Sequence, residues 1–478
     1  MADKKKKKES KVADIKADFP NLYKDISNDD FETCMNYSKE YMNFLDMSKT
    51  EREFVVNTID AAKDLGFVDI EEKKTLKAGD KVYSSIKGKG LVMAVIGTQP
   101  VRTGINILGA HIDSPRLDLK PNPVIEDCEA AYFKTHYYGG IKKYQWTTIP
   151  LAIHGVVYTA DGVEHNIVIG ENDDDPIFYI TDLLPHLGGE QMSKKANEFI
   201  PGEDLTVVIG GMPLKGEEKE AYKAYVLNYL YETYGIKEKD FVTGEIEIVP
   251  AMKARDVGFD RAFIAAYGHD DKVCAYPAIT ALFEQERPHK TCVCMLTDKE
   301  EIGSYANSGA QSVLYENFLM ELLVKNEAAD GNKGTFDMLM FRKAIAASKM
   351  LSTDVSNAYD PKYASVSDRS NTAYMSHGMK IEKYVGSRGK SGTNEATGDF
   401  VAEIIKVFND NSIPWQTGEL GKIDAGGGGT ISAYMAKYGM NVVDAGVPVW
   451  SMHAPYEVIS KIDLYYTFLA YKAFIENI

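Results

Sequence analysis

The chain has 478 residues, more than one ordinary hydrophobic core accommodates, so two domains are the natural expectation. Hydrophobic residues make up 44% and charged residues 26% of the sequence, the balance of a soluble globular protein. The net charge of −16 argues against nucleic acid or an anionic membrane as the main partner, because both attract positively charged surfaces.

The five cysteines are scattered and odd in number, so they predict no disulfide framework and favour a reducing compartment such as the cytoplasm. No apolar run approaches the length of about 18 residues that a membrane-spanning helix needs, so none is expected. A lysine run, Lys4–Lys8, opens the chain without an apolar stretch behind it and does not resemble a signal peptide. We interpret this run as a solvated tail, with a weak docking role as the alternative.

The first part of the chain predicts helix followed by short strands. Apolar residues recur at steps of three and four over residues 28–66, which is typical of a helix with one buried face. Residues 81–86 and 91–96 are predicted as two strands joined by a glycine turn. The apolar run 106–110 is predicted as a buried strand that ends at His111. Ligands bind at the carboxyl ends of strands in open α/β sheets, so His111 is a candidate ligand.

Residues from about 120 to 255 change to a β-rich pattern. The predicted strands are residues 132–138, 147–158, 166–170 and 245–250, with one helix over 217–234. We infer that residues 120–255 form an inserted domain. The catalytic domain would then be discontinuous, formed by residues 1–119 and 256–478.

From about residue 258 the sequence alternates between helical and strand patterns. Helices are predicted at residues 272–285, 311–325, 394–409 and 461–475, and strands at residues 291–297, 349–353 and 441–445. This alternation predicts an α/β fold.

Side chains that commonly bind metal ions follow several of the predicted strands. They are His111, Asp113, Asp270, Asp271, Glu300, Glu301, Asp354 and His453. Taken singly, each segment is more often structural: a core histidine paired with an aspartate, acidic residues at a helix start, or a surface glutamate pair. Taken together at strand ends, they predict a site that holds two divalent cations and leaves one carboxylate free.

The spacing assigns provisional duties within this set. Asp113 lies two residues after His111, on the same side of a continuing strand, where it could fix the histidine tautomer. One carboxylate of the Asp270-Asp271 pair could bridge two cations about 3.5–4 Å apart. One carboxylate of a Glu300-Glu301 pair beside such cations would bind metal, while the other would act as a general base toward water.

These motifs resemble the aspartyl aminopeptidase/aminopeptidase I family of zinc metallopeptidases, and most of all its bacterial members. The matching segments are Gly109–Pro115, Gly268–Lys272, Asp298–Ser304, Asp354-Val355 and Met452–Ala454. The resemblance covers nearly the whole chain. It implies a zinc-peptidase-like α/β/α sandwich interrupted by a β-rich dimerisation domain. It also implies a cytoplasmic di-zinc aminopeptidase that hydrolyses the N-terminal peptide bond of peptide substrates.

The resemblance also implies a division of the metal ligands. His111 and Asp354 would bind one zinc ion, His453 and Glu301 the other, and Asp270 would bridge the two. Cobalt or manganese could replace zinc. Within the same scheme, Glu300 would be the general base and Asp113 would orient the first histidine.

Three further candidates concern the substrate. In the resembled family the inserted domain makes a dimer and lends a histidine to the partner's active site, and His186 lies in the matching segment here. A preference for an acidic N-terminal residue would need a basic group, for which Arg388 and Lys390 are the candidates, with a solvated glycine-rich loop as the alternative. The resembled family assembles as a tetrahedral dodecamer, so a homo-oligomer built from dimers is expected.

Two alternatives compete with an aminopeptidase. The ligand set would also fit a related co-catalytic zinc amidohydrolase acting on N-acyl amino acids or carboxypeptide substrates, although the insert and the Ser114-Pro115 extension favour the aminopeptidase. The other alternative is a non-catalytic, metal-stabilised assembly protein. Glu300 favours an enzyme, because structural metal binding does not require a spare carboxylate.

Overall fold

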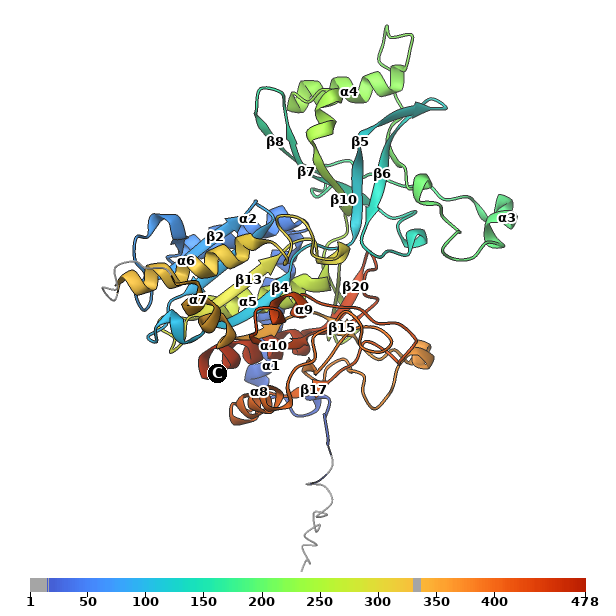
Figure 1. Cartoon of the computed structure of the whole chain (residues 1–478). Coiled ribbons are helices and arrows are strands. Elements are labelled where there is room, and N and C mark those ends of the chain that lie inside the picture. The colour runs from blue at the N-terminus through green and yellow to red at the C-terminus, as the bar shows by residue number, and fades with distance from the viewer. Residues whose placement is uncertain (1–14, 16, 330–336) are drawn as a thin grey trace, which may run out of the picture.

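The computed structural model describes residues 15, 17–329 and 337–478, which form three β-sheets with helices around them (Figure 1). The lysine run Lys4–Lys8 lies outside the described residues, so its expected role as a tail is not tested. No described helix combines the length and the apolar character that crossing a bilayer requires.

The largest sheet has nine strands in the order β1-β2-β3-β13-β4-β14-β18-β16-β17. The strands are β1 (Val68–Asp69), β2 (Lys81–Ile86), β3 (Gly90–Val95), β4 (Asn106–His111), β13 (Cys292–Thr297), β14 (Lys349–Ser352), β16 (Met379–Glu382), β17 (Trp415–Thr417) and β18 (Asn441–Gly446). β4 runs parallel to both β13 and β14, and His111 stands opposite Thr297 in the register. The carboxyl ends of these central strands therefore meet at one edge of the sheet.

Helices cover both faces of this sheet. Five of them pack into one core: α1 (Asn28–Asp46), α2 (Glu51–Asp64), α5 (His269–Phe283), α8 (Gly398–Asp410) and α10 (Lys461–Asn477). Three pack into another: α6 (Val313–Ala329), α7 (Met338–Ala346) and α9 (Ser432–Ala436). Leu108 and Cys294 face the first core, whereas their neighbours Ile107 and Val293 face the second, as side-chain alternation along strands requires. The predicted α/β/α sandwich is confirmed.

The helical pattern predicted over residues 28–66 is divided between two helices. α1 ends at Asp46, and Thr50 starts α2 with a capping box in which its hydroxyl accepts from the Glu53 amide while the Glu53 carboxylate accepts from the Thr50 amide. This reciprocal pair satisfies free N–H groups at a helix start, so it begins a new helix after the break.

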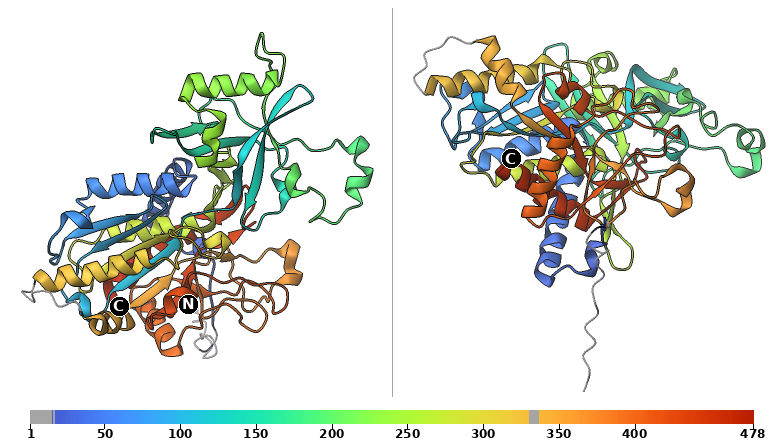
Figure 2. Two further views of the ribbon diagram at one scale, coloured as in Figure 1. Left: turned by 45° about the horizontal axis from the view of Figure 1, so that its top comes forward. Right: turned by 60° about the horizontal axis from the view of Figure 1, so that its bottom comes forward.

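The second sheet has six strands in the order β8-β7-β10-β5-β6-β9, all of them between residues 116 and 250. The strands are β5 (Arg116–Asp127), β6 (Ala130–Tyr138), β7 (Leu151–Tyr158), β8 (Glu164–Ile169), β9 (Val207–Gly210) and β10 (Glu245–Pro250). With α4 (Ala221–Tyr234) it encloses a core of its own. Figure 2 shows this part standing beside the sandwich, with an arm around α3 (Gly189–Met192) projecting from it.

A third, five-stranded sheet lies next to the edge where β4, β13 and β14 end (Figure 1). Its strands are β11 (Arg255–Val257), β12 (Phe263–Ala266), β15 (Ser356–Asn357), β19 (Pro448–Trp450) and β20 (Glu457–Ser460). The turn between β19 and β20 contains His453, so this sheet brings a second imidazole toward the carboxyl ends of the central strands.

Charged side chains join the sandwich to the six-stranded sheet. His154 of β7 is buried between the Glu53 carboxylate, 2.6 Å from its Nδ1, and the Glu171 carboxylate, 3.0 Å from its Nε2. Lys49 Nζ lies 2.6 Å from the same Glu171 carboxylate. These contacts cross from the start of α2 to the inserted strands, so they fix the two parts against each other.

Candidate metal centre

His111 ends β4 with its ring oriented for metal binding. Its Nδ1 lies 3.0 Å from the carbonyl oxygen of Asp113 and donates to it. Its Nε2 faces carboxylates instead, 3.1 Å from Asp270 Oδ1 and 3.9 Å from Asp354 Oδ1. Because Nδ1 is committed to the Asp113 carbonyl, Nε2 is the nitrogen that faces the space between the carboxylates, where a metal-bound histidine would offer its lone pair.

His453 mirrors this arrangement from the turn after β19. Its Nδ1 lies 2.9 Å from the Gly140 carbonyl oxygen, and its Nε2 lies 3.2 Å from Asp270 Oδ2 and 3.4 Å from Glu301 Oε2. Asp270 therefore stands between the two imidazoles, with Oδ1 toward His111 and Oδ2 toward His453. This is the placement that a carboxylate bridging two cations would have.

Asp113 fixes the turn that carries the glutamate pair. Its Oδ1 accepts from the amide of Glu300 at 3.1 Å, and its Oδ2 accepts from the amide of Glu301 at 3.2 Å. The residue before the pair, Lys299, adopts a left-handed conformation with φ of 67°, which turns the chain sharply after β13. Because Asp113 is completely buried and also lies beside His111, one carboxylate orders both neighbouring strand ends.

The carboxylates lie close together in a buried space, so their negative charges repel one another when no cation is present. Burial, with the charges of Asp113 and Asp270, raises the pKa of Glu300 to about 7. Burial and neighbouring carboxylates also raise the pKa values of Glu301 and Asp354 well above their ordinary range. Glu301 Oε1 has no hydrogen-bond partner in the described structure. A divalent cation would satisfy this oxygen and relieve the repulsion, so the donor set fits a metal ion.

Two groups of ligand atoms are close enough to hold an ion. One comprises His111, Asp270 and Glu301, and the other comprises His111, Asp271 and Asp354. Asp271 is fully buried, and one of its oxygens accepts weakly from the His111 amide at 3.4 Å. Asp270, whose two oxygens face the two imidazoles, is the better placed of the pair for bridging.

A cavity of about 350 Å³ opens onto this centre. Its lining includes six residues predicted for the site: His111, Asp270, Glu300, Glu301, Asp354 and His453. Glycines and apolar side chains complete the wall, among them Gly427–Gly429, Val385 and Leu420. The candidate metal ligands therefore lie at a space large enough for a small organic substrate.

Three predicted substrate residues are not among those that line this cavity. Arg388 and Lys390 are exposed, and Lys390 Nζ pairs with the Glu395 carboxylate at 2.9 Å. His186 is exposed in a short 3-10 turn, Pro185–Leu187, beside the projecting arm. Within one described chain, none of the three is brought to the metal centre.

Two residues that contact the centre were not predicted from the sequence. Glu457 of β20 accepts from the His453 amide at 2.6 Å through Oε1 and from the Asp270 amide at 3.0 Å through Oε2. Tyr138, at the end of β6, donates its hydroxyl to Asp113 Oδ2 at 2.6 Å. The contact of Glu457 with His453 is local, but those of Glu457 with Asp270 and of Tyr138 with Asp113 span 187 and 25 residues, so no local spacing pattern could have revealed them.

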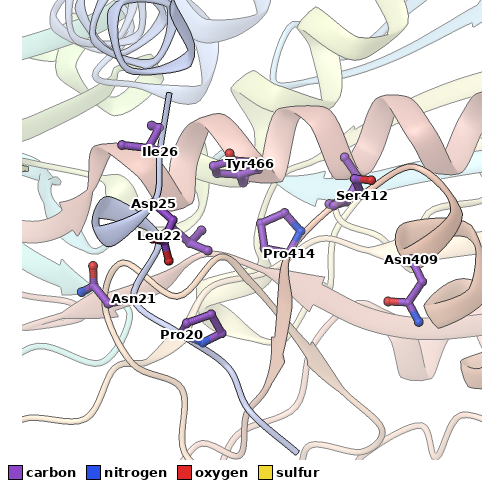
Figure 3. A pocket seen from close by; sticks show the side chains of 10 residues that line it. Pro20, Asn21, Leu22, Asp25, Ile26, Asn409, Ser412, Pro414 and Tyr466 are labelled. Atoms are coloured by element: carbon purple, nitrogen blue, oxygen red, sulfur yellow. The ribbon is translucent and has the colours of Figure 1, made fainter. Parts of the chain in front are cut away.

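A second cavity, of about 370 Å³, lies between the N-terminal segment and the turn before β17 (Figure 3). Pro20, Leu22 and Ile26 come from that segment, and Tyr466 reaches in from α10. Asp25 is the one acidic side chain in its described lining. It therefore lacks the ligand set that the other cavity has.

Comparisons with known proteins agree with this geometry. The model of the aminopeptidase I zinc metalloprotease (M18) family matches residues 44–475. The "Probable M18 family aminopeptidase 1" of Clostridium acetobutylicum is 48% identical over 469 residues, which cover 97% of this chain and 99% of the relative. The crystal structure of an M18 family aminopeptidase from Thermotoga maritima superposes with a TM-score of 0.92 at 43% identity, covering 97% of this chain and all of that one. The mApe1 dodecamer of S. cerevisiae, 18% identical, shares the fold with a TM-score of 0.73 over 92% of this chain and 96% of its own.

Proposed function

Because this chain belongs to the aminopeptidase I zinc metalloprotease (M18) family, we propose that its centre binds two zinc ions and cleaves the N-terminal peptide bond of peptides. An aminopeptidase activity follows from the family, and the proposal adds the number of metal ions and the duty of each residue. The observation that carries it is the position of Asp270, with one oxygen near each imidazole.

The ligands divide naturally around this carboxylate. His111 and Asp354 would hold one ion, while His453 and Glu301 would hold the other. Asp270 would contact both. Zinc accepts such imidazole and carboxylate donors, and paired sites of this kind polarise a carbonyl oxygen and an attacking water molecule. Cobalt or manganese could serve with the same donors.

Glu300 is left over when these five ligands are assigned, although it lines the same cavity. We assign it as the general base that takes a proton from the attacking water and returns it to the departing amine. Asp113 supports this duty by accepting from the Glu300 backbone amide, which keeps the side chain beside the ligands.

The substrate proposal concerns the N-terminal side chain. A strict acidic preference calls for a cation in the cavity, but none of the described lining residues is Lys or Arg. We therefore favour substrates with a neutral N-terminal residue. Arg388, Lys390 and His186 remain candidates only if a neighbouring subunit brings them to the cavity.

For the assembly, we propose a homo-oligomer built from dimers through residues 120–255, with a tetrahedral dodecamer as the full form. The projecting arm supports it: Leu183, Leu184, Leu187 and Met192 are all exposed within this one segment, and grouped exposed apolar side chains are typical of an interaction surface. The related yeast protein is a dodecamer. We place the enzyme in the cytoplasm, because its five cysteines predict no disulfide framework.

The test of the catalytic assignment is Glu300→Gln. This variant should keep its zinc, measured by elemental analysis, while turnover of aminoacyl anilides falls by about 10²–10⁴-fold. The exposed Glu71→Gln is a matched control and should behave as wild type. Unchanged turnover in Glu300→Gln would show that this residue is not the general base. Activity confined to N-blocked amino acids would indicate an amidohydrolase and not an aminopeptidase.

A further inference from the structure

We propose that the end of β6 in the six-stranded sheet, Tyr138–Gly140, positions the metal ligands of its own subunit. Tyr138 acts through Asp113, and the Gly140 carbonyl acts through His453. This inference rests on the proposed function, because it concerns how firmly the same two-metal centre is held.

Tyr138 completes the hydrogen bonding of a carboxylate that touches no solvent. Its hydroxyl donates to Asp113 Oδ2 at 2.6 Å, and the same oxygen accepts from the Glu301 amide at 3.2 Å. Asp113 is 0% exposed, so no water molecule replaces a lost donor without rearrangement. Because Asp113 also lies beside His111, the hydroxyl of Tyr138 helps to fix a ligand of each proposed zinc ion.

Two cationic side chains lie close to the Tyr138 ring. The Arg116 guanidinium lies 4.0 Å from the ring centroid, and Lys299 Nζ lies 5.3 Å from it. Arg116 is anchored in turn by Glu247 of β10 at 3.2 Å and by Glu51 of α2 at 3.4 Å. The position of the hydroxyl is therefore set jointly by the sandwich and the six-stranded sheet.

Two residues further on, the backbone holds the other imidazole. The Gly140 carbonyl accepts from His453 Nδ1 at 2.9 Å, so Nε2 is the nitrogen that faces Asp270 and Glu301. Gly140 itself lies against the ring, since a Cβ added there would be 3.4 Å from His453 Nδ1. Carbonyl groups that accept the second N–H of a ligating histidine commonly set its orientation and basicity.

The six-stranded sheet thus supports the metal centre of its own subunit, in addition to any contact that it makes between subunits. It supplies one hydroxyl to Asp113 and one carbonyl to His453, and both come from a single strand end. A displacement of that end relative to the sandwich would loosen both halves of the centre together.

The first experiment compares Tyr138→Phe with wild type in zinc affinity, measured by competition against a chromogenic chelator on the full-length protein. We expect the variant to bind zinc about 10-fold more weakly, the lower end of the effect of removing such a supporting hydrogen bond. Tyr137→Phe is the matched control, because Tyr137 is the preceding residue of β6, is partly exposed and faces away from Asp113; it should bind zinc as wild type does.

A second variant tests the other contact without removing a hydrogen bond to Asp113. Gly139 has a φ of 76°, where a residue with a Cβ is strained, and an added Cβ would lie 3.3 Å from Glu301 Oε2. Gly139→Ala should therefore displace the backbone that carries the Gly140 carbonyl and weaken zinc binding by about 10-fold. Gly162→Ala is the matched control, because Gly162 has a φ of 84° and an added Cβ there meets nothing within 4 Å. This variant decides the question if Tyr138→Phe does not fold.

The two proposals fail in different ways. If wild type binds zinc and cleaves aminoacyl anilides, but Tyr138→Phe or a folded Gly139→Ala binds zinc as tightly as wild type, the positioning duty of the hydroxyl or of the strand-end backbone, respectively, is refuted. If wild type itself neither binds zinc nor cleaves these substrates, the proposed function fails first. Weaker zinc binding in both variants, with both controls unchanged, supports the positioning role.

Discussion

Replacing Glu457 by Gln should damage the metal centre although the two side chains have nearly the same shape. The Glu457 carboxylate is 1% exposed and accepts two backbone amides, one from His453 and one from Asp270. A glutamine offers one oxygen and one NH₂ group. Its oxygen can therefore accept a hydrogen bond from one of the two backbone amides. Its NH₂ group must face the other amide, and two donors cannot form a hydrogen bond with each other.

The magnitude follows from that geometry. One buried amide N–H would be left unsatisfied, which costs about 1–3 kcal/mol. If the protein relieves this conflict by moving the turn that carries His453, the cost appears as weaker zinc binding of roughly 5- to 150-fold, since about 1.4 kcal/mol corresponds to a factor of ten. If the turn stays in place, the same cost appears as lower stability.

The assay therefore measures both quantities on the same protein. Zinc affinity is determined by chelator competition, and the free energy of unfolding of the metal-free protein is determined by urea titration. Glu218→Gln, an exposed substitution in the six-stranded part, provides the control. The reasoning is refuted if Glu457→Gln matches wild type in both zinc affinity and stability, because the second amide would then need no acceptor.

Two further predictions concern pH and metal. Burial alone lowers the pKa of His154, but hydrogen bonds to Glu171 and Glu53 raise it above the ordinary value of about 6.5. The ion pairs of His154 should therefore stabilise the protein fully below about pH 6.5, and this stabilisation should be lost as the pH rises through the higher folded-state pKa. The urea midpoint of wild type should fall more steeply over this pH range than that of His154→Gln. His165→Gln is the control, and parallel curves for wild type and His154→Gln would contradict this prediction. Zinc at 100 times its dissociation constant should stabilise the protein by about 2.7 kcal/mol, seen as a drop in melting temperature when EDTA removes it. Equal melting temperatures with and without EDTA would argue against a metal that binds only the folded state.

The parts of the fold that follow from local pattern were predictable. β4, β13 and β14 are short runs of buried apolar residues bounded by polar ones, and each was placed to within a residue or two. Their parallel pairing then accounts for why His111, Glu300 and Asp354 converge. Candidate ligands could be identified because they directly follow such strands.

The parts that depend on distant contacts were not predictable in this way. β5 was missed because Pro121 and Pro123 interrupt its alternation, and the register of β5 against β6 shifts between Leu119 and Val124 to accommodate them. The break after α1 was missed although Thr50 and Glu53 have the spacing of a capping box. Glu457 and Tyr138 become relevant only when remote segments meet.

The point at which the chain enters the six-stranded sheet limits how this protein could be recombined. β5 begins at Arg116, three residues after Asp113, and Arg116 already packs on the Tyr138 ring. A chimera that exchanged residues 116–250 as a cassette would therefore exchange part of the metal centre's support. A chimera with a transplanted sheet should retain its metal affinity only when the new sheet brings a hydroxyl and a carbonyl to the same two positions. This requirement limits which homologous sheets can be exchanged at this junction.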